Sequence, residues 1–125
     1  MIEAESTELQ INQSVDLKPY NSLAISAVAE YFCSVQNISQ LESALAFANN
    51  NNLILTPIGG GSNLVIASDL TGLVLHIDLK GIEIISSDKE TINIRFAAGE
   101  NWHSSVTYCL ENGCYGLENL ALIPG

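Results

Sequence analysis

The sequence predicts an α+β fold, in which a strand–helix–strand unit precedes a hairpin and a second helix. Residues 27–35 (AVAEYFCSV) alternate imperfectly between apolar and polar side chains, which is typical of a half-buried strand. Residues 39–48 carry one apolar stripe at helical spacing. Residues 53–55 (LIL) are apolar throughout, as in a parallel strand covered on both faces. The order of these segments predicts a parallel βαβ unit.

The helix of this unit is expected to begin at a capping box. Ser39 and Glu42 stand three residues apart, so each side chain can accept a hydrogen bond from an amide at the helix start. The apolar stripe consists of Leu41, Ala44, Leu45 and Ala48. Four asparagines at 49–52 should end the helix, because Asn tolerates the left-handed conformation of a helix C-terminus.

The second half of the chain predicts more strands and one more helix. Residues 64–66 and 73–77 are expected to be strands joined by a turn at 68–72, and residues 83–85 and 91–97 to form a hairpin. A helix should run from Asn101 to Glu111 and stop at Gly113. Residues 1–17 are polar and acidic and are expected to be a loose lead-in, so that the domain covers 18–125.

Composition limits the classes of protein to which the chain can belong. At 125 residues, 47% hydrophobic and 14% charged, it suits one globular domain without a membrane span. A net charge of −10 with four basic residues argues against nucleic acid as a partner. The acidic start lacks the pattern of a secretory signal, so a cytoplasmic location is expected. Cys33, Cys109 and Cys114 are an odd number of cysteines without CxxC spacing, so neither a disulfide framework nor a zinc site is supported, and no metal is expected.

The segment PIGGGSNLVIA, residues 57–67, places three glycines between two apolar runs. Backbone without side chains can approach a ligand closely, and successive amides can surround one anion. The segment lacks the Lys of a P-loop and the third glycine and helix of the dinucleotide fingerprint. Two interpretations remain open on these features: a tight connection, or a loop that binds phosphate without a helix dipole.

Three longer segments resemble one enzyme family. They are LKPYNSLAI (17–25), PIGGGSNLVIASDLTGLVLHIDLKGIEI (57–84) and AAGENWHSSVTYCLENGCYGLENLALIPG (97–125), and they resemble the N-terminal part of the UDP-N-acetylenolpyruvoylglucosamine reductases, flavoenzymes of bacterial peptidoglycan synthesis. The resemblance implies an FAD-binding domain of the PCMH type, as in the vanillyl-alcohol oxidase group. In that domain a small parallel βαβ subdomain packs on a mainly antiparallel one, with FAD between them.

The resemblance also implies which residues bind the cofactor. The residues matched to the FAD-contacting segments of the family are Ile58, Gly59, Gly60, Gly61, Ser62, Asn63, Leu64, Leu122, Ile123, Pro124 and Gly125. The first seven match the loop that holds the diphosphate through backbone amides, and the last four open a second segment that continues in the family. Many relatives have Glu at the position of Gly60.

The reaction of the family uses NADPH and FAD to reduce UDP-GlcNAc-enolpyruvate to UDP-N-acetylmuramate. Its catalytic Arg, Ser and Glu have no counterpart in this chain, so no catalytic residue is named and the chain alone is expected to be inactive. Two alternatives stay open: a chain that folds without flavin and has a structural role, and another oxidase with the same FAD-binding fold.

Other polar residues have ordinary structural interpretations. His76 is expected to be half-buried in a sheet, and His103 to lie at the surface or cap a helix. Glu100 and Asn101 suit a helix start, where a carboxylate meets the positive end of the helix dipole and Asn can cap. Trp102 is expected to be a core residue.

Overall fold

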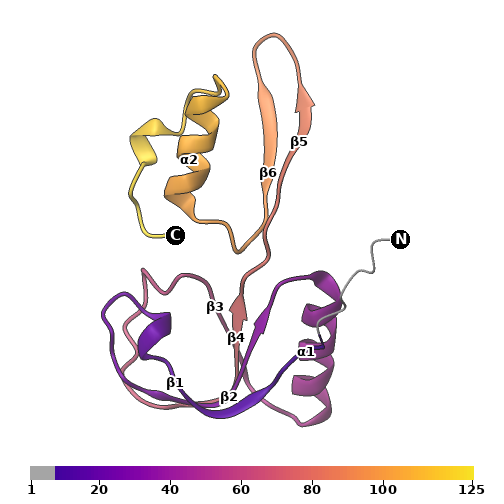
Figure 1. Cartoon of the computed structure of the whole chain (residues 1–125), viewed down its shortest axis with the longest axis vertical. Helices are drawn as coiled ribbons and strands as arrows, with labels where there is room; N and C mark the ends of the chain where they lie inside the picture. The colour runs from indigo at the N-terminus through magenta and orange to yellow at the C-terminus, as the bar shows by residue number, and fades with distance from the viewer. Residues whose placement is uncertain (1–7) are drawn as a thin grey trace.

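The computed structural model describes residues 8–125 as two packed parts (Figure 1). The elements in chain order are β1 (Asn12–Asp16), the 3-10 helix η1 (Lys18–Tyr20), β2 (Val28–Val35), α1 (Ile38–Asn50), β3 (Leu55–Ile58), β4 (Leu70–Ile77), β5 (Ile82–Ser87), β6 (Ile92–Phe96), α2 (Trp102–Glu111) and the 3-10 helix η2 (Glu118–Leu120). One part holds β1 to β4 with α1, and the other holds the hairpin β5–β6 with α2. The expected α+β class is confirmed.

The larger sheet has the strand order β1-β2-β4-β3. Strands β2 and β3 both pair in parallel with β4, and β1 pairs antiparallel with β2. The βαβ unit formed by β2, α1 and β3 is therefore present, but β4 is inserted between its two strands. The buried run Leu73, Val74 and Leu75 explains this position, because a central strand is covered on both faces.

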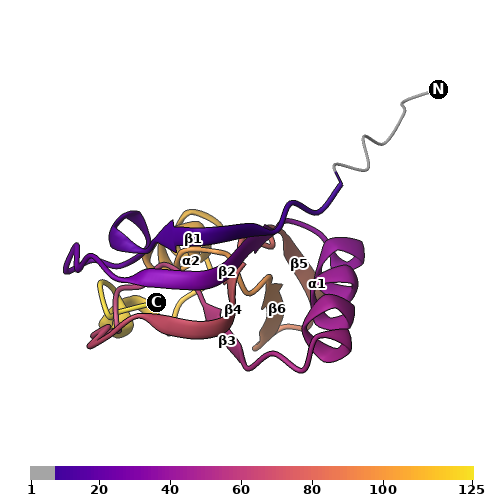
Figure 2. The same ribbon diagram turned by 90° about the horizontal axis from the view of Figure 1, so that it is seen from below.

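Two apolar clusters lie on the two faces of this sheet. One contains Leu17, Ala27, Ala29, Phe32, Ile58, Ile66 and Val74, and the other contains Cys33, Val35, Ala44, Ala48, Leu73 and Leu75. Helix α1 covers the second face, as the view from below shows (Figure 2). The sheet core thus fixes β3 and β4, whose carboxyl ends point toward the second part of the chain (Figure 1).

The predicted start of α1 is wrong by two residues. Asn37, in an extended conformation, is the N-cap, and its side-chain oxygen accepts a hydrogen bond from the amide of Gln40 at 2.9 Å. Ser39 lies inside the helix. The end of α1 agrees with the expectation, because the helix stops at Asn50 and Asn52 adopts the left-handed conformation at φ 51°.

The expectation of a loose N-terminal lead-in is wrong for residues 12–17. Strand β1 pairs with β2, and the side chain of Leu17 is fully buried. The amide of Leu17 donates to the carbonyl of Ala27 at 2.8 Å, which ties this segment to the start of β2. Residues 1–7 of the predicted lead-in lie outside the described residues.

The predicted strand at 64–66 is also wrong. This segment belongs to the loop between β3 and β4, where Ile66 is buried and Val65 is exposed. The predicted turn at 68–72 ends early, since β4 begins at Leu70. Gly72 sits inside β4 at φ +83°, and a Cβ there would lie 2.2 Å from the carbonyl oxygen of Ile54.

The hairpin and the second helix agree with the sequence. Strands β5 and β6 pair antiparallel, and α2 begins after Asn101, whose side chain accepts from the amide of Ser104 at 2.9 Å. Phe96 and Tyr108 pack edge to face, which joins the hairpin to α2. No helix within residues 8–125 is long and apolar enough to cross a membrane.

Candidate functional site

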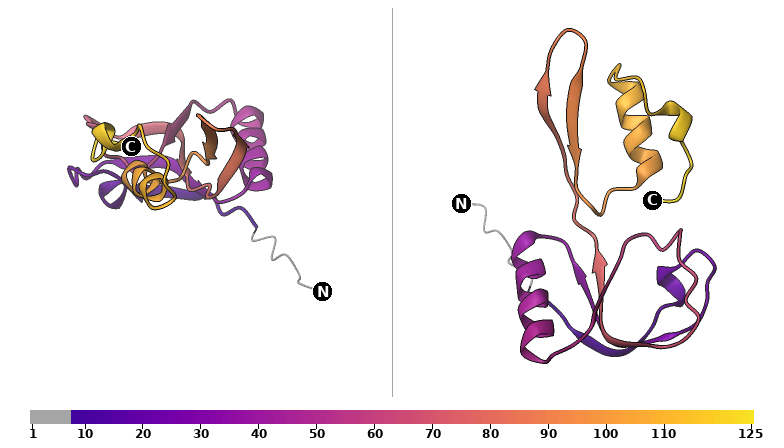
Figure 3. Two further views of the ribbon diagram at one scale, coloured as in Figure 1. Left: turned by 90° about the horizontal axis from the view of Figure 1, so that it is seen from above. Right: turned by 180° about the vertical axis from the view of Figure 1, so that it is seen from behind.

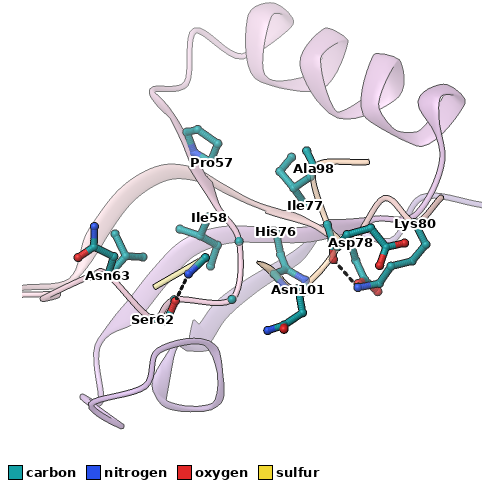
Figure 4. Close-up of a pocket in the computed structure, with 17 residues that line it drawn as sticks. Pro57, Ile58, Ser62, Asn63, His76, Ile77, Asp78, Lys80, Ala98 and Asn101 are labelled. Atoms are coloured by element: carbon teal, nitrogen blue, oxygen red, sulfur yellow. Dashed lines mark hydrogen bonds and ion pairs between the residues drawn. The ribbon is translucent and has the colours of Figure 1, made fainter. Parts of the chain in front are cut away.

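A cavity of about 490 Å³ lies where the two parts of the chain meet (Figure 4). Its walls are the loop after β3, the end of β4 and the segment that leads into α2. The residues that line it are Pro57, Ile58, Gly59, Gly60, Gly61, Ser62, Asn63, Leu64, His76, Ile77, Asp78, Lys80, Ala98, Gly99, Glu100, Asn101 and Gly125. The cavity therefore lies at the carboxyl ends of parallel strands, the usual place for ligands in such sheets.

The glycine loop begins at the buried end of β3. Ile58 is in the core, while Gly59 and Gly60 are exposed and a Cβ on either would meet nothing within 4 Å. Gly61 is different, because its φ is +68° and a Cβ would lie 2.0 Å from the carbonyl oxygen of Tyr20. Gly61 is thus required by the fold, whereas Gly59 and Gly60 leave the backbone open.

The loop presents backbone donors beside the cavity. Within residues 8–125, the amides of residues 60–63 donate no hydrogen bond to another residue, whereas the carbonyl of Gly61 accepts one from the amide of Ser22 at 3.1 Å. The carbonyl bond fixes the loop against the segment after η1. The amides remain available to an external acceptor such as a phosphate oxygen.

The end of the described chain returns to this loop (Figure 3). The amide of Gly125 donates to Oγ of Ser62 at 3.0 Å, and the carbonyl of Gly125 accepts from the amide of Trp102 at 3.3 Å. The Trp102 indole N–H donates to the carbonyl of Leu120 at 2.7 Å. Trp102 is half-buried and braces the C-terminal segment, which differs from the expected core role.

A second cavity of about 380 Å³ continues the first along the C-terminal segment. It is lined by Ser22, Gly60, Ser62, Asn101, His103, Leu122, Ile123, Pro124 and Gly125. Both cavities share Gly60, Ser62, Asn101 and Gly125, so they form one groove. All eleven residues matched to cofactor-binding positions line this groove.

The end of β4 supplies the opposite wall. Nζ of Lys80 lies 3.3 Å from a carboxylate oxygen of Asp78 and also donates to the carbonyl of Gly99. A Cβ on Gly99 would lie 2.5 Å from the amide nitrogen of Leu79, so only glycine allows this contact between the two segments. The Lys80 ammonium therefore already has two acceptors within the protein, whereas the loop amides have none among residues 8–125.

Glu100 and Asn101 form the wall nearest to α2. Asn101 caps α2 as expected. The carboxylate of Glu100 instead accepts a hydrogen bond from the amide of Gly81 at 2.7 Å, which holds the α2 segment against the chain that leaves β4. The Glu100 carboxylate therefore makes a tertiary contact, where the sequence indicated an interaction with the dipole of α2.

His76 and His103 also line the groove. The sequence indicated structural roles for both residues and assigned neither to the cofactor site. His76 is half-buried as expected, with Nδ1 2.8 Å from Oγ of Ser34 and its ring 5.3 Å from that of Tyr20. Its place at the carboxyl end of a buried strand was the available signal. Within the described residues, no group of His, Cys, Asp and Glu side chains could hold a metal ion.

These observations fit an FAD diphosphate. Two exposed glycines permit close approach to the backbone, and the amides of residues 60–63 are available as donors. The groove consists of two cavities that share lining residues, so it extends from the loop along the C-terminal segment. The two segments that the resemblance assigned to FAD meet at the hydrogen bond between Ser62 and Gly125.

Comparisons with known proteins show the family to which the chain belongs. A profile described as FAD binding domain matches residues 29–125. The UDP-N-acetylenolpyruvoylglucosamine reductase of Pseudomonas putida is 44% identical over 117 residues, which cover 94% of this chain and 34% of that protein. The reductase of Amoebophilus asiaticus is 39% identical over the same shares. The chain spans about a third of the length of the curated relatives it matches.

The fold has a solved counterpart. The crystal structure of UDP-N-acetylenolpyruvylglucosamine reductase from Thermus caldophilus matches with a TM-score of 0.67 and 22% identity, over 94% of this chain and 39% of that one. The expected fold of the PCMH-type FAD-binding domain is confirmed. The chain therefore belongs to the FAD binding domain family, whose cofactor is FAD, and is similar to the FAD-binding region of the UDP-N-acetylenolpyruvoylglucosamine reductases.

Proposed function

We propose that this chain forms part of the FAD cradle of a UDP-N-acetylenolpyruvoylglucosamine reductase and holds the diphosphate with the amides of residues 60–63. The observation that carries the proposal is the hydrogen bond between Ser62 and Gly125, which joins the two matched segments at the groove. Identity of 44% to a reductase of that name supports the assignment. A protein of charge −10 can hold a diphosphate here because amide donors need no basic side chain.

The whole enzyme would reduce UDP-GlcNAc-enolpyruvate with NADPH and form UDP-N-acetylmuramate for peptidoglycan, in the cytoplasm. This step serves cell-wall synthesis, and through it cell shape and division. When bound, FAD supplies a two-electron carrier between NADPH and the enolpyruvyl double bond. The residues of this chain bind the cofactor, fix its position and shield one side of it from water.

The chain contributes no catalytic residue in this proposal. The relatives are about three times as long, and the groups that bind and protonate the substrate are assigned to the part without a counterpart here. The 125 residues alone should therefore give no reductase activity. Turnover of the enolpyruvyl substrate by the 125-residue chain with NADPH and FAD would contradict this division of labour.

Flavin binding separates the proposal from its structural alternative. FAD added to the 125-residue chain should lose fluorescence on binding, with weaker affinity than in a complete reductase that contains this segment. A complete reductase that contains this segment and purifies without flavin, and cannot be reconstituted with FAD, would favour a structural role. Reduction of the enolpyruvyl substrate by that longer protein distinguishes the reductase from another oxidase of the same fold.

A further inference from the structure

The C-terminal end of α2 brings two cysteines together. Gly113 follows the helix with φ +71°, and its amide donates to the carbonyl of Leu110 at 3.1 Å. The amide of Cys114 donates to the carbonyl of Cys109 at 2.7 Å. These two bonds define a Schellman motif, in which the side chains at the positions of Cys109 and Cys114 are frequently neighbours.

The backbone bond limits how far apart the two residues can be. A carbonyl oxygen lies about 2.4 Å from its own Cα and an amide nitrogen about 1.5 Å from its own, so a 2.7 Å bond keeps the two Cα atoms within about 6.6 Å. Disulfides join Cα atoms that are roughly 4.4–6.8 Å apart. The backbone therefore holds the Cα atoms of Cys109 and Cys114 within the distance that a disulfide spans.

The surroundings of the two thiols differ. Cys109 is 3% exposed, and Cys114 is half-buried with its Sγ 3.5 Å from the carbonyl oxygen of Asn112 at the helix end. Burial raises the pKa of the Cys109 thiol, and the nearby Cys114 raises it further. A reagent from solution therefore reaches Cys114 first, and Cys109 is the neighbour that can complete the reaction.

Cys33 provides an internal reference. It lies in β2, in the core beneath α1, and is fully buried. Burial raises the pKa of its thiol to about 11, so almost none of it is ionised at neutral pH. Cys33 should therefore remain reduced under conditions that oxidise the other pair.

We propose that Cys109 and Cys114 form a reversible redox site that a small-molecule disulfide, such as oxidised glutathione, converts to an intramolecular disulfide. Cys114 loses its proton, and its thiolate attacks one sulfur of the reagent and expels a thiolate, which takes up a proton. Cys109 then loses its proton, and its thiolate attacks the Cys114 sulfur of the mixed disulfide and expels the second thiolate, which is protonated in turn. The protein loses two protons and two electrons, and the reagent is reduced to two thiols. The site does not depend on the FAD assignment.

Thiol counting tests the proposal on the full chain. After oxidised glutathione and removal of excess reagent, titration in denaturant should find one free thiol in place of the three of the reduced chain, and dithiothreitol should restore three. Peptide mapping should show Cys109 joined to Cys114, with the protein mass lower by about two hydrogens. Cys33→Ala should go from two free thiols to none.

The matched variant Cys114→Ser removes the attacking thiol and should keep two free thiols after the same treatment. Three free thiols in the treated parent chain would overturn the proposal. So would a stable glutathione adduct on Cys114, or dimers joined through Cys114, because either means that Cys109 cannot reach the Cys114 sulfur. The mapping uses the unsubstituted chain, so the result does not depend on whether a variant folds.

Discussion

Oγ of Ser62 accepts a hydrogen bond from the amide of Gly125 at 3.0 Å, across 63 residues of sequence. This bond links the glycine loop after β3 to the segment braced by Trp102. Both segments line the same groove, and both are the segments that the proposed function assigns to FAD. The bond therefore brings two distant stretches of chain together at one groove.

Ser62→Ala should weaken FAD binding. The variant removes an exposed hydroxyl whose hydrogen bond is worth about 0.5–1.5 kcal/mol, so we expect a loss of affinity of roughly two- to twelve-fold with little change in unfolding temperature. Flavin fluorescence titration measures the affinity. Ser68→Ala is the matched control, since Ser68 is also exposed in this loop but lies outside the groove. Equal effects of the two variants would contradict the role of Ser62.

The three glycines should respond differently to substitution. Gly59→Val should lower FAD affinity at least about tenfold without loss of fold, because a Cβ there meets no protein atom within 4 Å and a larger side chain on a residue that lines the groove would obstruct a ligand at the backbone. Gly60→Ala should retain binding, because a Cβ there would meet nothing within 4 Å and the resemblance to the reductase family implies that a side chain is tolerated at this position. Flavin titration measures the affinity, and thermal unfolding shows whether the fold is retained. Unchanged affinity of Gly59→Val would argue against binding of the diphosphate by the amides of this loop.

Gly61→Val should damage the fold rather than the ligand site. A Cβ would overlap the carbonyl of Tyr20, and the positive φ is strained for Val, so we expect a loss of stability of about 2 kcal/mol or more. Urea unfolding monitored by circular dichroism measures this loss. A Gly61→Val protein as stable as the parent would show that this loop packs differently against the segment after η1.

The N-cap of α1 gives a stability test. Asn37→Ala should cost about 1 kcal/mol because it leaves the amide of Gln40 without its partner. Ser39→Ala should change the free energy of unfolding by less than about 0.5 kcal/mol, since Ser39 is exposed within the helix. Urea unfolding of both variants measures the difference. A larger loss for Ser39→Ala would restore the capping box that the sequence suggested.

Asp88 makes stability sensitive to acid. Hydrogen bonds from the amides of Glu90 and Thr91 and from the Thr91 hydroxyl lower the pKa of the Asp88 carboxyl below 3.8 in the folded chain. The folded state therefore binds this proton less readily than the unfolded state, so the stabilisation exists at neutral pH and is lost as the pH falls through the lowered value. NMR titration of the carboxyl carbon should give a pKa below 3.8, and a value at or above it would be inconsistent with the turn.

Sequence patterns within single segments predicted several helices and strands correctly. The βαβ order, the β5–β6 hairpin and α2 from Asn101 onward follow from periodicity and capping residues. Strand β1 could not be predicted from its mainly polar sequence, because its strand conformation comes from pairing with β2. The apolar run 64–66 gave the opposite error: Ile66 is buried by the sheet, although the segment is a loop.

At the site, too, features that depend on contacts between distant residues could not be predicted from the sequence. The glycine triplet indicated a phosphate loop, but the separate task of Gly61 depends on Tyr20, which lies far away in the sequence. Asn37 and Ser39 are both good N-cap residues, so only the path of the chain after β2 determines which one caps α1. Contacts between distant residues decided each of these points.

A crystal structure with FAD bound, of this chain or of a full-length reductase that carries its sequence, tests the central claim most directly. We expect the diphosphate oxygens to lie within about 2.7–3.2 Å of amide nitrogens of residues 60–63, beside the Ser62–Gly125 hydrogen bond. A diphosphate bound elsewhere, with these amides facing solvent, would contradict the account.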